Sequence, residues 1–268
     1  MGGFFEFLKG RVVIPANGSI SDFKNVLQHE LVHVFTNSKV NQVFRDHGLF
    51  NHAGLPLWFT EGIAEYWSID WDSQTEMFMR DAVLNNYVFL PSRLYQISGS
   101  FLMYKEGQAL VKYIAETYGE EKLLMLMENL WMGKQFSEVL RLTIGKNYKD
   151  MDKEWGYALK KQFYPLLEEN ESVRMTTRQL TKKGFNIKPA YYEKENEQNI
   201  VFISTRTGYA NIYLKPLTDA EEDVESHVLV AGGRTSDFES FHLLSSNIDV
   251  NSSGRLVFVS KSGERDQL

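Results

Sequence analysis

The spacing of apolar side chains changes along the chain. In residues 21–36 they recur every three to four positions, which predicts a helix with Ser21 or Asp22 as its N-cap. The apolar positions of this helix are Phe23, Val26, Leu27, Leu31, Val34 and Phe35. Similar spacing predicts further helices over residues 56–68, 73–85, 102–118, 120–131, 135–143 and 148–169. Gly119 and Gly145 follow two of these helices, at the position where glycine commonly ends one.

Other segments have a period of two. Residues 10–15 predict a short strand ahead of the first helix. Residues 197–217 predict two strands joined by a turn at Thr207-Gly208, and residues 254–268 repeat this pattern, since the sequence VFIS matches a later VFVS. All-strand repeats of about 40–60 residues are typical of β-propeller blades.

These patterns predict an α+β protein. We expect a mainly helical domain with a short N-terminal strand over residues 1–170, a polar linker over 171–190 and an incomplete, all-β propeller-like segment over 191–268. The second repeat stops in mid-pattern at Leu268, and an unclosed blade leaves exposed strand edges. We therefore expect the chain to be part of a longer protein that supplies the remaining blades, and to be shortened at its N-terminus as well.

Composition narrows the possible chemistry. The 268 residues are 43% hydrophobic and 24% charged, which is typical of globular domains. The absence of cysteine excludes disulfides and thiolate metal sites, so any metal must be held by histidines and carboxylates. The net charge of −6 argues against nucleic acid as a partner. We find no apolar run long enough for a transmembrane segment and no signal peptide.

A short motif lies within the first predicted helix. His29, Glu30 and His33 form an H-E-x-x-H pattern, and residues four apart share one face of a helix. Both imidazoles can therefore bind one metal ion, while Glu30 stays close enough to contact a metal-held water. A chance match is the alternative, but the N-cap and the apolar positions around the motif favour a metal site.

The next predicted helix offers a third ligand. A catalytic zinc site needs three protein ligands, and no third histidine follows the motif at short spacing. Glu61 is the candidate, and Glu65 lies one turn later, where a carboxylate can orient a ligating imidazole. The alternative is an exposed helix with two ordinary glutamates. The aromatic residues around the pair and Gly62 in the helix interior argue against it.

At these motifs the sequence resembles a known family. HELVH followed by PLWFTEGIAEY looks like the gluzincin metallopeptidases, whose second helix carries W-x-x-E-G-x-A. The closer resemblance is to the bacterial peptidase MA-like group, which is often fused to a TolB-type β-propeller, and residues 104–119 are similar to that group as well. The resemblance covers residues 10–165 for the peptidase and 190–268 for the start of a propeller.

The resemblance implies a zinc peptidase that acts on peptides or proteins and is exported from the cell. It makes His29, His33 and Glu61 the ligands of one Zn²⁺ and Glu30 the general base, and it places Glu65 against the first histidine. Two departures argue against an aminopeptidase specificity. The loop expected over residues 37–55 is longer than in aminopeptidase-N-type enzymes, and the G-x-M-E-N motif is missing.

Some roles stay open. The resemblance favours Tyr104 as the group that stabilises the oxyanion, although a packing role fits equally well. We expect His47 and His52 to be solvated and His227 and His242 to be structural or surface residues. The alternative function is a catalytically inactive peptidase-like scaffold that binds partners together with a propeller. It is disfavoured because the ligands and the base are all present.

Overall fold

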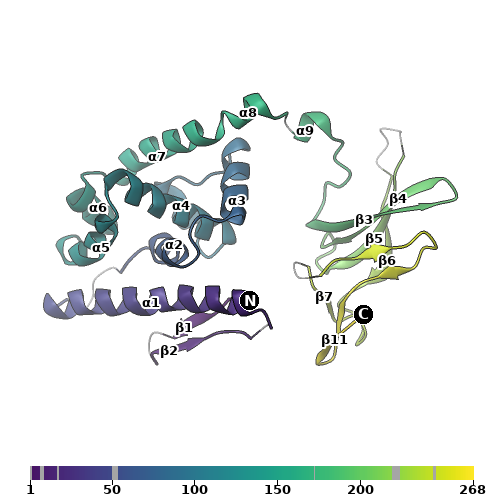
Figure 1. Cartoon of the computed structure of the whole chain (residues 1–268), viewed down its shortest axis with the longest axis horizontal. Helices are drawn as coiled ribbons and strands as arrows, with labels where there is room; N and C mark the ends of the chain where they lie inside the picture. Colours follow the sequence, from purple (N-terminus) through teal and green to yellow (C-terminus); the bar gives the residue numbers. More distant parts are fainter. Residues whose placement is uncertain are drawn as a thin grey trace. The chain divides into compact units, whose positions relative to one another are not determined.

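The computed structural model describes residues 2–6, 9–16, 18–49, 54–171, 173–218, 224–243 and 246–268. The chain forms two compact units, Met1–Glu171 and Ser172–Leu268. The first is mainly helical and the second is built from antiparallel strands (Figure 1). An α+β chain with a helical N-terminal part is therefore confirmed. Among the described residues, no helix has both the length and the apolar character needed to cross a membrane.

The helical unit begins with a strand hairpin, of which only the second strand was expected. Its elements are β1 Phe4–Glu6, β2 Arg11–Val13, α1 Ile20–Asp46, α2 Leu57–Ser68, α3 Ser73–Leu84, the 3₁₀ helix η1 Pro91–Ile97, α4 Phe101–Tyr118, α5 Glu121–Glu128, the 3₁₀ helix η2 Asn129–Met132, α6 Phe136–Ile144, α7 Tyr148–Phe163 and α8 Leu166–Glu169. Figure 1 shows α1 running alongside the hairpin, with the remaining helices on its other side.

The first helix differs from its prediction in two ways. It continues to Asp46, so the loop expected over residues 37–55 is helical in its first half. Its buried face also differs, because Glu30, His33, Thr36 and Val43 are buried while Phe35 of the expected apolar face is 69% exposed. The helix therefore turns a largely polar face toward the protein, and that face carries the H-E-x-x-H motif.

Side-chain caps mark the beginning of two later helices. The Ser100 hydroxyl accepts a hydrogen bond from the backbone of Met103 at the start of α4, and Asn147 forms a capping box with Asp150 at the start of α7. Two expected helices are interrupted. The one over residues 120–131 becomes α5 followed by η2, and the one over 148–169 breaks before Pro165, where the ring and the missing N–H disfavour an uninterrupted helix.

The helical core lies where α2 and α4 cross. Its largest completely buried side chains include Phe59, Trp155 and Phe163. Gly62 of α2 and Gly107 of α4 face each other so closely that a Cβ atom at Gly62 would lie 2.5 Å from the backbone of Gly107. This contact fixes the distance between the helix that carries Glu61 and the helix that carries Tyr104.

The second unit is a strand-rich fold with its own small core. Its elements are α9 Val173–Thr176, β3 Asn186–Lys194, β4 Glu197–Ser204, β5 Asn211–Pro216, β6 His227–Ala231, β7 Ser240–Phe241, β8 Asp249–Val250, β9 Leu256–Val257, β10 Ser260–Ser262 and β11 Arg265–Gln267. Strands β3 to β6 form one antiparallel sheet in chain order, packed through Val201, Ile203 and Ile212.

The hairpin expected over residues 197–217 is present as β4 and β5. The segment 171–190, expected as a linker, contains α9 and the beginning of β3. The later VFVS sequence is not one strand, because it is divided between β9 and β10, and β10 pairs with β7 and β11. A four-stranded antiparallel sheet is compatible with a propeller blade, and the propeller itself stays a prediction.

Candidate metal centre

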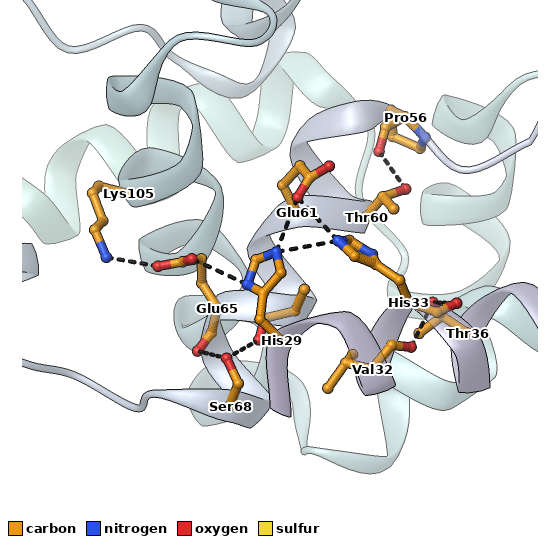
Figure 2. Close-up of polar contacts among 11 residues, drawn as sticks. His29, Val32, His33, Thr36, Pro56, Thr60, Glu61, Glu65, Ser68 and Lys105 are labelled. Atoms are coloured by element: carbon orange, nitrogen blue, oxygen red, sulfur yellow. Dashed lines mark hydrogen bonds and ion pairs between the residues drawn. The ribbon is translucent and has the colours of Figure 1, made fainter. Parts of the chain in front are cut away.

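Three side chains from two helices converge on one point. His29 and His33 lie one turn apart on α1, and Glu61 reaches the same point from α2 (Figure 2). The Nε2 atoms of the two histidines are 3.1 Å apart. The Glu61 Oε2 atom lies 3.3 Å from the Nε2 of His29 and 3.2 Å from the Nε2 of His33. These residues form the His-His-Glu cluster that can bind a metal ion.

The size of this triangle fits a metal ion. Ligand atoms held tetrahedrally at about 2.0–2.2 Å from zinc lie about 3.3–3.6 Å from one another, close to the separations seen here. The donor set of two imidazoles and one carboxylate is also one that catalytic zinc sites use, with the fourth position open. The residues present therefore fit a zinc ion without any rearrangement of the backbone.

The cluster favours positive charge at its centre. Burial by itself lowers the pKa of His29, but hydrogen bonds to the Glu61 and Glu65 carboxylates outweigh it and raise that pKa to about 9. Burial by itself raises the pKa of Glu61, but its hydrogen bonds to His29 and His33 bring it down to about 2. Without a metal, a proton on His29 supplies the positive charge. A divalent cation bound at the same point can replace this proton.

Glu65 lies behind His29 rather than in the triangle. Its Oε1 atom is 3.2 Å from the Nδ1 atom of His29, the ring nitrogen that points away from the cluster. Burial raises the pKa of Glu65, but hydrogen bonds to His29 and Lys105 outweigh that effect and keep it below its usual range. An ionised carboxylate at Nδ1 holds the proton there, which leaves the Nε2 lone pair free for a metal.

Glu30 contributes a buried carboxyl group without a partner. The residue is only 4% exposed, and its Oε2 atom makes no hydrogen bond to any described residue. Burial raises the pKa of Glu30 above its usual value. A buried carboxyl group whose Oε2 atom has no partner among the described residues, and which lines the same cleft as the histidines, is placed to exchange a proton with a bound molecule.

A cleft of about 660 Å³ opens over the cluster. Its apolar lining residues are Phe4, Phe5, Val26, Leu57, Ile69 and Phe101. Tyr104 also lines the cleft, and its ring centroid is 6.3 Å from that of His29. Burial, reinforced by the nearby Glu61 carboxylate, raises the pKa of Tyr104 to about 12, so the hydroxyl keeps its proton and can donate a hydrogen bond.

The remaining histidines lie elsewhere. His47 is at the C-terminal end of α1, about 20 Å along the helix from His33, and it stacks on Trp131 with ring centroids 4.2 Å apart. It is exposed, as expected, although it has an aromatic neighbour. His227 and His242 belong to the strand-rich unit, where His242 contacts Asp266. His52 lies outside the described residues.

Two buried ionisable residues of α4, next to Tyr104 in the sequence, are not among those predicted from the sequence. Lys105 is 3% exposed and forms an ion pair with Glu65. Its neighbour Glu106 is completely buried, and burial raises the pKa of that carboxyl to about 8. Both lie in the stretch 104–119 that resembles the peptidase MA-like group, but no spacing rule identifies either, because Lys105 meets Glu65 of α2 and Glu106 accepts from the backbone of Phe89.

Comparison with known proteins agrees with this geometry. The profile of the Peptidase MA superfamily matches residues 12–161, which is more than half of the chain and includes every residue of the cluster. Searches of curated proteins and of solved structures return no significant match. The matched range covers the H-E-x-x-H motif on α1, Glu61 on α2 and the cleft residue Tyr104 on α4. The chain belongs to the Peptidase MA superfamily.

Proposed function

We propose that the helical unit is a zinc-dependent peptidase of the gluzincin type, with His29, His33 and Glu61 as the ligands of one zinc ion. The observation that carries the proposal is the convergence of three ligand atoms within 3.1–3.3 Å of one another. The unpartnered Glu30 carboxyl in the same cleft supports a hydrolytic role rather than a purely structural one.

When bound, zinc supplies Lewis-acid polarisation of the scissile carbonyl and lowers the pKa of water to about 7. Glu30 accepts a proton from the attacking water as its oxygen bonds to the carbonyl carbon. Glu30 then gives this proton to the nitrogen as the C–N bond breaks, so that an amine leaves. The raised pKa of Glu30 suits a group that must hold a proton between these two steps. The Tyr104 hydroxyl donates a hydrogen bond to the oxyanion.

The lining of the cleft supports a peptide or protein as the substrate. Apolar side chains form much of its wall, so the residues beside the scissile bond are expected to be held by apolar contact. A peptide or an unfolded segment of a protein has the required backbone carbonyl and such side chains. Export of the protein, and a TolB-type propeller that begins in the strand-rich unit, are further proposals that rest on the resemblance in sequence.

The test separates proton transfer from metal binding. Glu30→Gln preserves the side-chain volume and removes the base, so the zinc content should remain about one ion per chain. Hydrolysis of an unstructured protein such as casein should fall by about 10²–10⁴-fold. Glu168→Gln is the matched control, because Glu168 is an exposed glutamate in α8 of the same unit, and it should leave activity unchanged.

Each result has a clear meaning. Full activity in the Glu30→Gln protein, purified in parallel with the control, would rule out this mechanism. A wild-type protein that binds zinc but hydrolyses no polypeptide in a broad panel would instead support the inactive scaffold. A wild-type protein that binds no zinc would contradict the metal site itself.

A further inference from the structure

A buried ion pair between Glu65 and Lys105 lies next to the candidate metal cluster. The Nζ atom of Lys105 lies 2.6 Å from the Oε2 atom of Glu65, whose Oε1 atom contacts His29 (Figure 2). Each carboxylate oxygen of Glu65 thus has its own partner, the histidine for Oε1 and the lysine for Oε2. The side chain of Lys105 is 3% exposed and that of Glu65 is 10% exposed, so water contributes little to either charge.

This contact depends on the close crossing of α2 and α4. Gly62 precedes Glu65 by three residues, and Gly107 follows Lys105 by two. A Cβ atom at Gly107 would lie 2.5 Å from the carbonyl oxygen of Trp58, so the two backbones are in direct contact. Phe101, one turn before Lys105, covers the ammonium group, with its ring centroid 5.5 Å from Nζ. The position of Lys105 beside Glu65 is therefore fixed by the contact between the two backbones and by the ring of Phe101.

Within the described ranges, only one of the two histidines of the cluster has a carboxylate behind its ring. Behind His29 stand Glu65 and then Lys105, whereas the Nδ1 atom of His33 is buried and has no hydrogen-bond partner among the described residues. A buried carboxylate that accepts from one imidazole alone has a second oxygen whose charge needs compensation. Lys105, which does not line the cleft itself, provides that compensation at Oε2.

We propose that Lys105 is a positioning residue that orients Glu65 and, through it, sets the direction of the His29 ring toward the metal. Lys105 does not line the cleft, so it acts on the metal only through Glu65. This builds on the proposed zinc site and adds to it a residue on a third helix, α4. The metal affinity of the site formed by His29, His33 and Glu61 then depends on a lysine that belongs to neither of the helices carrying these three residues.

The test is a double-mutant cycle on zinc affinity, measured by competition with a chelator. Lys105→Met should weaken zinc binding about tenfold, and Glu65→Gln about 10–100-fold. The double variant should bind zinc no more weakly than Glu65→Gln alone, because a lysine that acts through Glu65 has nothing left to act on. Lys112→Met is the matched control, since Lys112 lies on the same helix and pairs with Glu116 at the surface.

Unfolding midpoints of the metal-free proteins distinguish positioning from packing. If Lys105 only stabilised the contact between helices, Lys105→Met would lower the midpoint and leave the zinc dissociation constant of the folded protein equal to that of Lys112→Met. That result would overturn the proposal, as would losses that multiply in the double variant. If Lys105→Met does not fold, Lys105→Gln retains a neutral donor and should lie between wild type and Glu65→Gln in zinc affinity. Absence of zinc binding in the wild type would instead refute the proposed function.

Discussion

The two units bury different kinds of polar group. In the helical unit, the described residues that are both ionisable and buried are Glu30, His33, Glu65, Lys105 and Glu106. In the strand-rich unit the buried polar residues are mostly neutral, namely Asn199, Ser204, Asn211 and Ser260, with Lys215 as the ionisable member. Buried ionisable groups are costly to keep, and Glu30, His33 and Glu65 of the helical unit line the cleft, whereas buried amides and hydroxyls commonly complete a fold. Buried ionisable side chains are therefore found around the candidate metal centre of the helical unit, whereas buried amides and hydroxyls complete the fold of the strand-rich unit.

The largest expected effect tests whether the metal belongs to the helical unit alone. His33→Ala removes one of the three proposed ligands, so the zinc content should fall from about one ion per chain to near zero after dialysis. His242→Ala removes a histidine that pairs with Asp266 in the strand-rich unit, and it should leave the zinc content unchanged. Metal analysis of both variants shows which unit holds the zinc. Loss of zinc in the His242→Ala protein would contradict a metal site confined to the helical unit.

The buried acid Glu106 should make the stability of the helical unit depend on pH. Burial raises the pKa of this carboxyl to about 8 from its ordinary value of 4.5, so between these values the folded protein holds a proton that the unfolded chain releases. The contribution of Glu106 to the free energy of unfolding is therefore lost as pH rises through this window, by about 1.4 kcal/mol per pH unit, and does not change further above it.

Glu106→Gln does not titrate and isolates this effect. Its free energy of unfolding relative to wild type should increase by about 1.4 kcal/mol per pH unit between about pH 5.5 and 7.5. The measurement is urea unfolding in the presence of EDTA, followed by tryptophan fluorescence, because all tryptophans of the chain lie in the helical unit. A difference that is constant with pH would show that Glu106 stays ionised in the folded protein.

The helix crossing offers a third comparison. Gly62→Ala places a Cβ atom 2.5 Å from the backbone of Gly107, which must push α2 away from α4 and should lower the free energy of unfolding by about 1–3 kcal/mol. Gly54→Ala is the control, because nothing lies within 4 Å of its Cβ position, and it should change stability by no more than about 1 kcal/mol. Equal stability of the two variants would mean that the crossing is not tight.

The smallest effect is expected in the strand-rich unit. The side chain of Asn211 accepts a hydrogen bond from the backbone of Gly232 at 3.0 Å and donates one to Thr207 at 2.9 Å. Asn211→Ala leaves the Gly232 N–H unpaired, which should cost about 1 kcal/mol of local stability. Hydrogen exchange of the β5 amides measures this loss, while the zinc affinity should stay at the wild-type value. A change in zinc affinity would contradict the separation of the two units.

Local signals in the sequence account for much of the helical unit. The ranges expected for α3, α4 and α6 agree with the structure to within one residue at each end, because side-chain caps and Gly145 act on the nearest turn only. The spacing of His29 and His33 likewise places two imidazoles on one helix face whatever surrounds it. The Glu61 position could be proposed because a catalytic zinc site needs a third ligand, and because aromatic residues surround this glutamate on the next predicted helix.

Features that depend on distant residues could not be predicted. Phe35 belongs to the apolar face expected for α1, yet the structure exposes it, because that helix turns Glu30 and His33 inward instead. The continuation of α1 to Asp46 was missed, since its last turns have polar residues and are held by contacts with α5 and η2. The sequence around Lys105 does not distinguish it from an exposed lysine. It is buried only because α2 and α4 approach each other closely.

The glycines at the helix crossing also constrain how this chain can change over generations. Every replacement of Gly62 or Gly107 adds at least one carbon atom, and in each case that atom would lie 2.5 Å from the backbone of the other helix. A compensating change at the opposite glycine is impossible, because glycine has no side-chain carbon to remove. We therefore expect descendants that keep Lys105 against Glu65 to keep both glycines together. A lineage that loses one glycine should then accumulate changes at Lys105 and Glu65 as well.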